Sequence, residues 1–331
     1  MSTAEVSLPQ TGVKDLLEAG LHFGHQTKRW NPKMAPYIFG ERNGIYVIDL
    51  GKSLGQLRLA QRFIYDTVVR GNHVLFVGTK KQAQQPIKEI AEQFGQPYVI
   101  HRWLGGMLTN NRTIQQSIKR MHDLEAMEDD GRMAALGSKK QMSALRREHA
   151  KLYRNLSGIA KMERLPAALI VFDVVREHIA ITEAQKLGIP IVALVDTNGD
   201  PDVVDYPIPG NDDGSRAIKL VVSVLGETIQ LASNEYAKVA AEEARLKAIR
   251  DEEEREAKAK AEAERQARLE EERVKREAAL AERKKEKEAE EAAKAAEEAA
   301  KAAEEAAKPA EPAPEPEAAP EPAEEEPKTE D

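Results

Sequence analysis

Short runs of apolar residues, each bounded by turn-forming residues, recur through the first two thirds of the chain and predict buried strands at residues 46–50, 73–77, 98–100, 167–172 and 191–195. Between these runs, apolar residues recur every three or four positions, which is typical of helices with one buried face. Strands that lack charge and alternate with helices belong in a parallel sheet covered on both faces. The pattern therefore predicts an α/β fold with a doubly wound, mainly parallel sheet.

One segment interrupts this alternation. Residues 111–154 carry about 40 residues of helical pattern where a single crossover helix would suffice. Asp and Gly residues at 129–131, together with Gly137, divide the segment in two. We expect an inserted α-helical hairpin that projects from a discontinuous α/β body formed by residues 1–110 and 155–235.

The composition changes again towards the C-terminus. Residues 236–306 consist almost entirely of Ala, Glu, Lys and Arg, with Glu placed four residues before Lys or Arg, a spacing that supports an exposed helix. Their few larger apolar residues keep no seven-residue repeat, so we expect a long charged helix without a stable coiled coil. Residues 307–331 are rich in Pro and Glu and cannot bury enough apolar area to fold, which predicts a disordered, solubilising tail.

Charge divides the chain at about the same place. Residues 1–240 hold 30 Lys or Arg against 26 Asp or Glu, whereas residues 241–331 hold 19 against 31. The overall charge of -8 therefore conceals a basic body. Within that body, residues 132–164 hold nine Lys or Arg and only two Glu. A surface so one-sided in sign is expected to meet a polyanion, and nucleic acid is the first partner that it predicts.

The composition also limits the chemistry. The chain has no cysteine, which excludes disulfides, thiolate metal sites and cysteine nucleophiles. No stretch reaches the roughly 18–20 apolar residues of a membrane-spanning helix, and the N-terminus has neither a basic start nor an apolar signal core. We therefore expect a protein that stays in the cytoplasm and has no membrane partner.

Two strand-to-helix turns resemble phosphate-binding loops. Gly51-Lys52-Ser53 lies where a nucleotide-binding loop would end, but Tyr46 replaces the first glycine that this motif requires. The turn Gly78-Thr79-Lys80-Lys81 either holds one anion on free amides and two cations or is a plain turn with solvated lysines. No Gly-x-Gly-x-x-Gly fingerprint accompanies it, so the sequence predicts no cofactor and no small-molecule substrate.

Two clusters resemble metal sites without meeting their requirements. Residues 196–202 place oxygen ligands at alternate positions, like the first half of an EF-hand loop, but Pro201 and Pro207 stand where that loop needs Gly and Glu. His22 and His25 lack the further ligands that a structural zinc site needs. We expect Asx turns and helix caps here, and no metal. Nor can any Ser-His-Asp order or carboxylate pair be singled out, so no catalytic residue is predicted.

Several segments resemble, in order, the signatures of the bacterial small-subunit ribosomal protein two family. They are LLEAGLHFGH at 16–25 with the following QTKRWNPKM, FVGTKKQA at 76–83, RWLGGMLTN at 102–110, the stretch 166–190 with Asp173, Glu177, Glu183 and Gly188-Ile189-Pro190, and residues 195–207. The similarity covers about residues 7–232. Several independent motifs in one order are far more specific than a single short pattern.

The resemblance implies a structural protein of the small ribosomal subunit whose α/β domain and hairpin contact 16S ribosomal RNA. It also implies a neighbour, the large mRNA-binding ribosomal protein built of OB repeats, whose attachment depends on this family. The chain departs from the common form at Gly199, where many members have cysteine, and in its unusually long C-terminal extension. The first departure argues against a thiol role, and the extension inherits no function.

Charge and resemblance together predict which side chains contact ribosomal RNA. On the body they are Lys28, Arg29, Trp30, Lys33, Lys80, Lys81 and Arg102, and on the hairpin they are Arg112, Lys119, Arg120, Lys139, Lys140, Arg146, Arg147, Lys151 and Arg154. Such phosphate contacts orient a protein on RNA but carry little base information. Trp30 and Trp103 lie among these cations, and each either stacks on an unpaired base or belongs to the core.

Two other functions fit parts of the sequence. A nucleotide-binding α/β enzyme would use the crevice where the strand order of the sheet reverses, and it predicts saturable nucleotide binding by the isolated protein. A scaffold would recruit protein partners through the charged extension, and it predicts that truncation after about Tyr236 abolishes the main activity.

Overall fold

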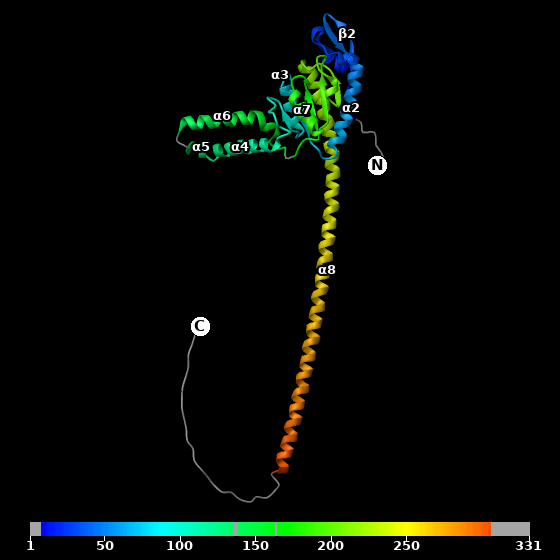
Figure 1. Ribbon diagram of the computed structural model, residues 1–331. Helices are drawn as coiled ribbons and strands as arrows, with labels where there is room; N and C mark the ends of the chain where they lie inside the picture. The colour runs from blue at the N-terminus through cyan, green and yellow to red at the C-terminus, as the bar shows by residue number, and fades with distance from the viewer. Residues whose placement is uncertain (1–7, 136–137, 163, 306–331) are drawn as a thin grey trace. The chain divides into compact units, whose positions relative to one another are not determined.

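The computed structural model describes residues 8–135, 138–162 and 164–305 (Figure 1). Its central element is a five-stranded sheet made of β4 (Val74–Val77), β5 (Tyr98–Val99), β6 (Ala168–Phe172), β7 (Ile191–Val195) and β8 (Tyr206–Pro209). All neighbouring strands are parallel, and they lie in the order β5-β4-β6-β7-β8. The order reverses between β4 and β6, as it does in doubly wound folds. The predicted fold class is therefore confirmed.

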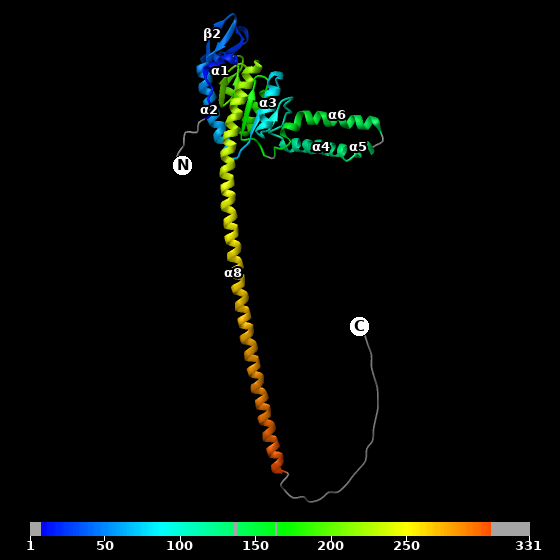
Figure 2. The ribbon, with the colours of Figure 1, turned by 180° about the vertical axis from the view of Figure 1, so that it is seen from behind.

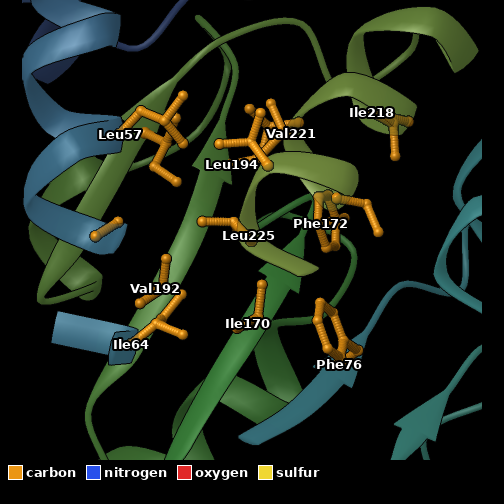
Figure 3. Packing of buried hydrophobic residues seen from close by; sticks show 14 of the residues in the cluster. Leu57, Ile64, Phe76, Ile170, Phe172, Val192, Leu194, Ile218, Val221 and Leu225 are labelled. Atoms are coloured by element: carbon orange, nitrogen blue, oxygen red, sulfur yellow. The ribbon is translucent and has the colours of Figure 1, made fainter. Parts of the chain in front are cut away.

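Helices cover both faces of this sheet because its strands are apolar on both sides. The flanking helices are α2 (Leu50–Val68), α3 (Lys81–Gln93), α7 (His178–Leu187) and α8 (Ser215–Glu305). On one face, Ile170 of β6 and Leu194 of β7 belong to a single buried cluster with Leu57 of α2 and Leu225 of α8 (Figure 3). This cluster anchors the beginning of α8 to the sheet.

The alternate residues of the same strands form a second core on the opposite face. Leu169 and Val171 of β6 belong there to a cluster with Ile181 of α7. Trp103 and Met107, from the turn that follows β5, complete the cluster, and Trp103 is only 7% exposed. Trp103 was predicted either to stack on a base or to belong to the core, and the structure places it in the core.

The first predicted strand belongs to a different sheet. Strand β3 (Ile45–Ile48) pairs antiparallel with β1 (Phe23–Gln26) and β2 (Ile38–Arg42). Asn43 and Gly44, both with positive φ, form the tight turn that reverses the chain between β2 and β3. The expectation that residues 46–50 join the parallel sheet is wrong, because this hairpin pairs them with their sequence neighbours first.

The inserted segment forms two antiparallel helices, as expected. Helices α4 (Asn111–Asp129) and α6 (Lys139–Leu156) lie side by side, and the short α5 (Arg132–Ala135) follows α4 near the tip (Figure 1, Figure 2). Apolar residues of α4, such as Ile118 and Met121, are buried against the other arm. The apolar side of the hairpin therefore continues the second core of the sheet, which leaves the outer faces of its helices to polar and charged side chains.

Helix α8 runs without interruption from Ser215 to Glu305. Near its start Val221 is fully buried, whereas side chains described beyond residue 246, where the second compact unit begins, are exposed. Ion pairs at the expected i,i+4 spacing follow its surface, and Lys258 Nζ lies 2.6 Å from Glu254 Oε1. Among the described residues, no helix is both long and apolar enough to cross a membrane. The tail predicted at 307–331 lies outside the described residues.

Replacing Phe172 by Ala is expected to lower the free energy of unfolding by about 3–5 kcal/mol, because its ring is buried in the core and its loss leaves a cavity. Phe39→Ala is the matched control, since that ring is 80% exposed and its loss should change stability by no more than about 0.5 kcal/mol. Denaturant unfolding followed by the fluorescence of the buried Trp103 measures both. Equal unfolding midpoints would contradict the core described above.

Candidate nucleic-acid interface

Basic side chains are concentrated on the hairpin. Residues 111–154 hold ten Lys or Arg against six Asp or Glu, and all ten cations are exposed. Two of the predicted RNA contacts are tied to the opposite arm: Arg120 Nε lies 3.0 Å from Glu148 Oε1, and Arg146 Nε lies 2.9 Å from Glu128 Oε1. Exposed pairs of this kind contribute little to stability, but they partly neutralise both cations.

The other predicted cations of the hairpin make no ion pair within the part of the chain that the structure describes. They are Arg112, Lys119, Lys139, Lys140, Arg147, Lys151 and Arg154. On α6, Lys139, Arg146 and Arg147 line a hollow of about 340 Å³. Cationic donors grouped around a hollow suit a phosphate group, which accepts charge-assisted hydrogen bonds.

A buried carboxylate fixes the point where the hairpin leaves the sheet. Glu183 of α7 accepts five hydrogen bonds of 2.7–3.2 Å, from the indole Nε1 of Trp103, the backbone amides of Gly106, Leu108 and Thr109, and the Thr109 hydroxyl. Gly106 has a φ of +89°, a conformation that glycine adopts without steric cost. This turn leads directly into α4, so Glu183 positions the whole row of hairpin cations.

The predicted residues near the N-terminus form a second basic region. Lys28 and Arg29 are exposed on the 3₁₀ helix η1 (Thr27–Arg29) and make no ion pair with any described residue. Trp30 follows them directly and is half-buried, and its ring centroid lies 5.2 Å from that of Tyr46. Trp30 therefore has one face packed on its own protein and is less available for stacking than a free ring.

The remaining cations of the body differ in whether a carboxylate is paired with them. Lys81, at the start of α3, and Arg102, after β5, are exposed and unpaired within the described residues. Lys33 is held by two carboxylates, because its Nζ lies 2.7 Å from Asp200 and 3.0 Å from Asp202. Of these three cations, Lys33 has the least charge left for a phosphate.

Lys80 occupies the crevice where the strand order of the sheet reverses. Its ammonium lies 2.7 Å from Asp212, 2.6 Å from Asp213 and 3.4 Å from Asp173, and only 14% of the side chain is exposed. Burial would lower the pKa of Lys80, but hydrogen bonds to Asp212 and Asp213 outweigh it and raise that pKa. An ammonium surrounded by three carboxylates cannot serve a phosphate without releasing them, so the geometry does not support Lys80 as an RNA contact.

The adjoining turn uses part of its hydrogen-bond donors within the protein. The backbone amide and the hydroxyl of Thr79 both donate to Glu177 Oε1, at 2.9 and 2.5 Å. Arg176 Nε donates in turn to the Thr79 hydroxyl, at 2.8 Å. Both donors of Thr79 are therefore used within the protein and are not available to a phosphate.

One histidine joins this acidic cluster. His25 Nδ1 lies 3.0 Å from Asp196 Oδ2, and its Nε2 lies 3.4 Å from Asp213 Oδ2. His25, Asp212 and Asp213 each offer one ligand atom, all within 4.8 Å of one another, and such a set could hold a cation. His25 is a candidate ligand in the sequence, but its pairing with Asp196 and Asp213, so far along the chain, follows only from the fold.

The fold also gathers basic residues that the sequence analysis did not select. Arg154, at the end of α6, lines one cavity together with Lys88 of α3 and His101. In α3 the two Lys are balanced by two Glu, so composition does not mark Lys88, whereas His101 directly precedes a stretch, residues 102–122, that holds four Lys or Arg and no Asp or Glu. Only the packing of the hairpin base against the edge of the sheet brings the three together.

Comparison with known proteins connects this geometry to a family. The family model described as ribosomal protein S2 matches residues 16–232. The small ribosomal subunit protein uS2 of Acidothermus cellulolyticus is 54% identical over 229 residues, which cover 69% of this chain and 82% of that relative. The uS2 proteins of Salinispora tropica and Corynebacterium efficiens are 54% and 52% identical, over 66% and 72% of this chain and 74% and 85% of their own lengths.

Glu183→Gln is expected to lower the free energy of unfolding by about 2–4 kcal/mol, because the amide cannot accept all five hydrogen bonds and leaves buried donors unpaired. Glu227→Gln, at an exposed position of α8, is the control and should change little. Urea unfolding of the three proteins at neutral pH measures the difference, and equal stabilities would contradict the proposed anchor.

The same anchor predicts a pH dependence. Burial would raise the pKa of Glu183, but the hydrogen bonds from Gly106, Trp103, Leu108 and Thr109 outweigh it and hold that pKa below its ordinary value of 4.5. Stability from the charged form is therefore complete above the ordinary pKa and is lost as the pH falls through the lowered one. The gap between wild type and Glu183→Gln should narrow as urea unfolding is repeated at pH values below 4.5. A gap that stays constant would contradict the assignment.

Proposed function

Because this chain belongs to the ribosomal protein S2 family, we propose that it binds 16S ribosomal RNA within the small ribosomal subunit through the basic side chains of its hairpin and body. The family is structural, and the chain is a ribosomal protein and not an enzyme. As a bacterial ribosomal protein it works in the cytoplasm, within the ribosome.

The observation that carries the proposal is the row of unpaired cations on the hairpin. Lys119 on α4 and Lys139, Lys140 and Lys151 on α6 are exposed and without a carboxylate partner among the described residues. Unpaired cations on a rigid support suit RNA phosphates, because each contact releases counterions without breaking an internal ion pair. The apolar packing of α4 and the Glu183 anchor supply that rigidity, so the cations keep fixed positions relative to the sheet.

The partner that we propose for the small N-terminal sheet (β1, β2 and β3) is the large mRNA-binding ribosomal protein built of OB repeats. The resemblance to the family supports this partner, and the small N-terminal sheet offers it apolar side chains. Phe39 of β2 is 80% exposed and Phe23 of β1 is 52% exposed. Exposed aromatic side chains of this size are typical anchors of protein–protein contacts.

Replacing Lys119, Lys139, Lys140 and Lys151 together by Ala is expected to weaken binding to 16S ribosomal RNA and to flatten its salt dependence. The slope of log K against log salt should fall by about 0.7–0.9 for each phosphate that the variant no longer neutralises. Filter binding across a series of salt concentrations measures this slope.

The matched control removes the same charge from the extension by replacing Lys260, Lys284, Lys285 and Lys287 with Ala, all of them exposed on α8. Its slope should remain close to that of the wild type. If both variants flatten the slope equally, net charge alone explains the effect and the hairpin is not the interface.

Truncation after Arg245 tests the alternative in which the protein is a scaffold that recruits partners through its charged extension. The family match ends at residue 232 and the first compact unit ends at Arg245, so the shortened chain retains both. On a sucrose gradient it is expected to sediment with small subunits in the same proportion as the full chain. Absence of the shortened chain from the subunit fraction would support the extension instead.

A further inference from the structure

A cavity of about 340 Å³ lies where the base of the hairpin meets the edge of the sheet. Its walls come from α3, from the edge strand β5 and the residues after it, and from the end of α6 with the 3₁₀ helix η3 (Ser157–Ile159). Gly158 allows this close meeting, since a Cβ there would overlap the carbonyl oxygen of Tyr98. The volume is within the roughly 300–1,000 Å³ of small-ligand sites.

The cavity is positively charged. Lys88, His101 and Arg154 line it, and no carboxylate is among the described residues of its lining. Arg154 makes no ion pair with any described residue, and Lys88 has only a long contact of 3.9 Å with Glu92. Burial lowers the pKa of His101, and the cations Arg154 and Lys88 lower it further, which fits a site that already carries an excess of positive charge. The chemistry of the cavity therefore favours an anion.

Aromatic and amide groups accompany these cations. Tyr153 lines the cavity, and its side chain is 52% exposed although it lies in a concave site. Its neighbour His149 has its ring centroid 5.9 Å away, which limits the freedom of the tyrosine ring. Tyr98 is fixed by a hydrogen bond of 2.6 Å from its hydroxyl to Glu92. The amide of Asn155 also lines the cavity and can both donate and accept hydrogen bonds.

A second cavity of about 450 Å³ continues the first along the same edge. The two share Lys88, Tyr98 and Tyr153, and the second adds Lys161 and His73 together with one carboxylate, that of Glu92. A site for a free metabolite would be closed around a single ligand. Two adjoining cavities with a basic residue in each instead fit successive units of a polyanionic chain.

We propose that this cavity binds one unpaired nucleotide of the RNA, with its phosphate held by Lys88 and Arg154, its base stacked on Tyr153 and its edge within reach of the Asn155 amide. The proposal rests on the RNA binding proposed above, and it adds a base-dependent contact to an interface otherwise made of phosphate contacts. Aromatic stacking with nearby cations is the usual way in which proteins hold single-stranded nucleotides.

The test compares the full chain with Tyr153→Ala and Tyr153→Phe, each bound to full-length 16S ribosomal RNA. Tyr153→Ala should weaken binding about fivefold or more and expose at least one unpaired base that the wild type protects from base-specific chemical probes. It should leave the salt slope unchanged, because no charge is removed. Tyr153→Phe keeps the ring and should bind within about twofold of the wild type. Tyr236→Ala, which removes a ring that is 43% exposed on α8, should leave the protected base unchanged.

The outcomes separate this proposal from the one on which it depends. If Tyr153→Ala keeps the affinity and every base protection while the four-lysine hairpin variant flattens the salt slope, the nucleotide site is wrong and RNA binding stands. If the wild type itself does not bind the RNA, both fail. If adenosine or uridine monophosphate saturates the site and 16S ribosomal RNA does not compete, the cavity serves a free nucleotide, and the assignment to an RNA strand is overturned.

Discussion

The arrangement of the molecule depends on one buried carboxylate, Glu183. It accepts hydrogen bonds from five donors in the turn between the edge of the sheet and the hairpin, and three of these donors are backbone amides. Backbone amides cannot move without moving the chain, so the carboxylate fixes the direction in which α4 begins. A basic hairpin attached by a loose loop would have to be ordered on binding, at an entropic cost that this anchor removes in advance.

Doubly wound sheets usually bind ligands at the point where the strand order reverses. In this chain that crevice holds Lys80 between carboxylates, and the adjoining turn donates its hydrogen bonds to Glu177. The position that serves a nucleotide in enzymes is here used for internal ion pairing. The architecture is thus shared with enzymes, while the chemistry at its customary site is not.

The sequence predicted the parallel sheet because charge-free strands on both faces leave few alternatives. It did not predict the smaller sheet, although Asn43 and Gly44 are a strong hairpin signal that a search for buried runs passes over. Strand β8 was missed because Pro207 and Pro209 argue against a strand, and they are tolerated there only because β8 is an edge strand.

Among the predicted RNA contacts, the sequence could locate the basic hairpin but not which of its cations are paired with carboxylates. Glutamates of the opposite arm partly neutralise Arg120 and Arg146. Lys80 is enclosed by aspartates that are distant in the chain. The cavity beside Arg154 also depends on tertiary packing, which unites α3, the residues after β5 and the end of α6. Long-range pairing of this kind leaves no trace in periodicity or composition.

The continuity of α8 has a consequence for how its charged portion melts. An isolated helix must first form a turn at a large entropic cost, whereas here the buried turns around Val221 supply that nucleus. The exposed portion only has to propagate from it, residue by residue. On warming it should therefore shorten gradually from its distal end, while the nucleus persists for as long as the sheet on which it packs.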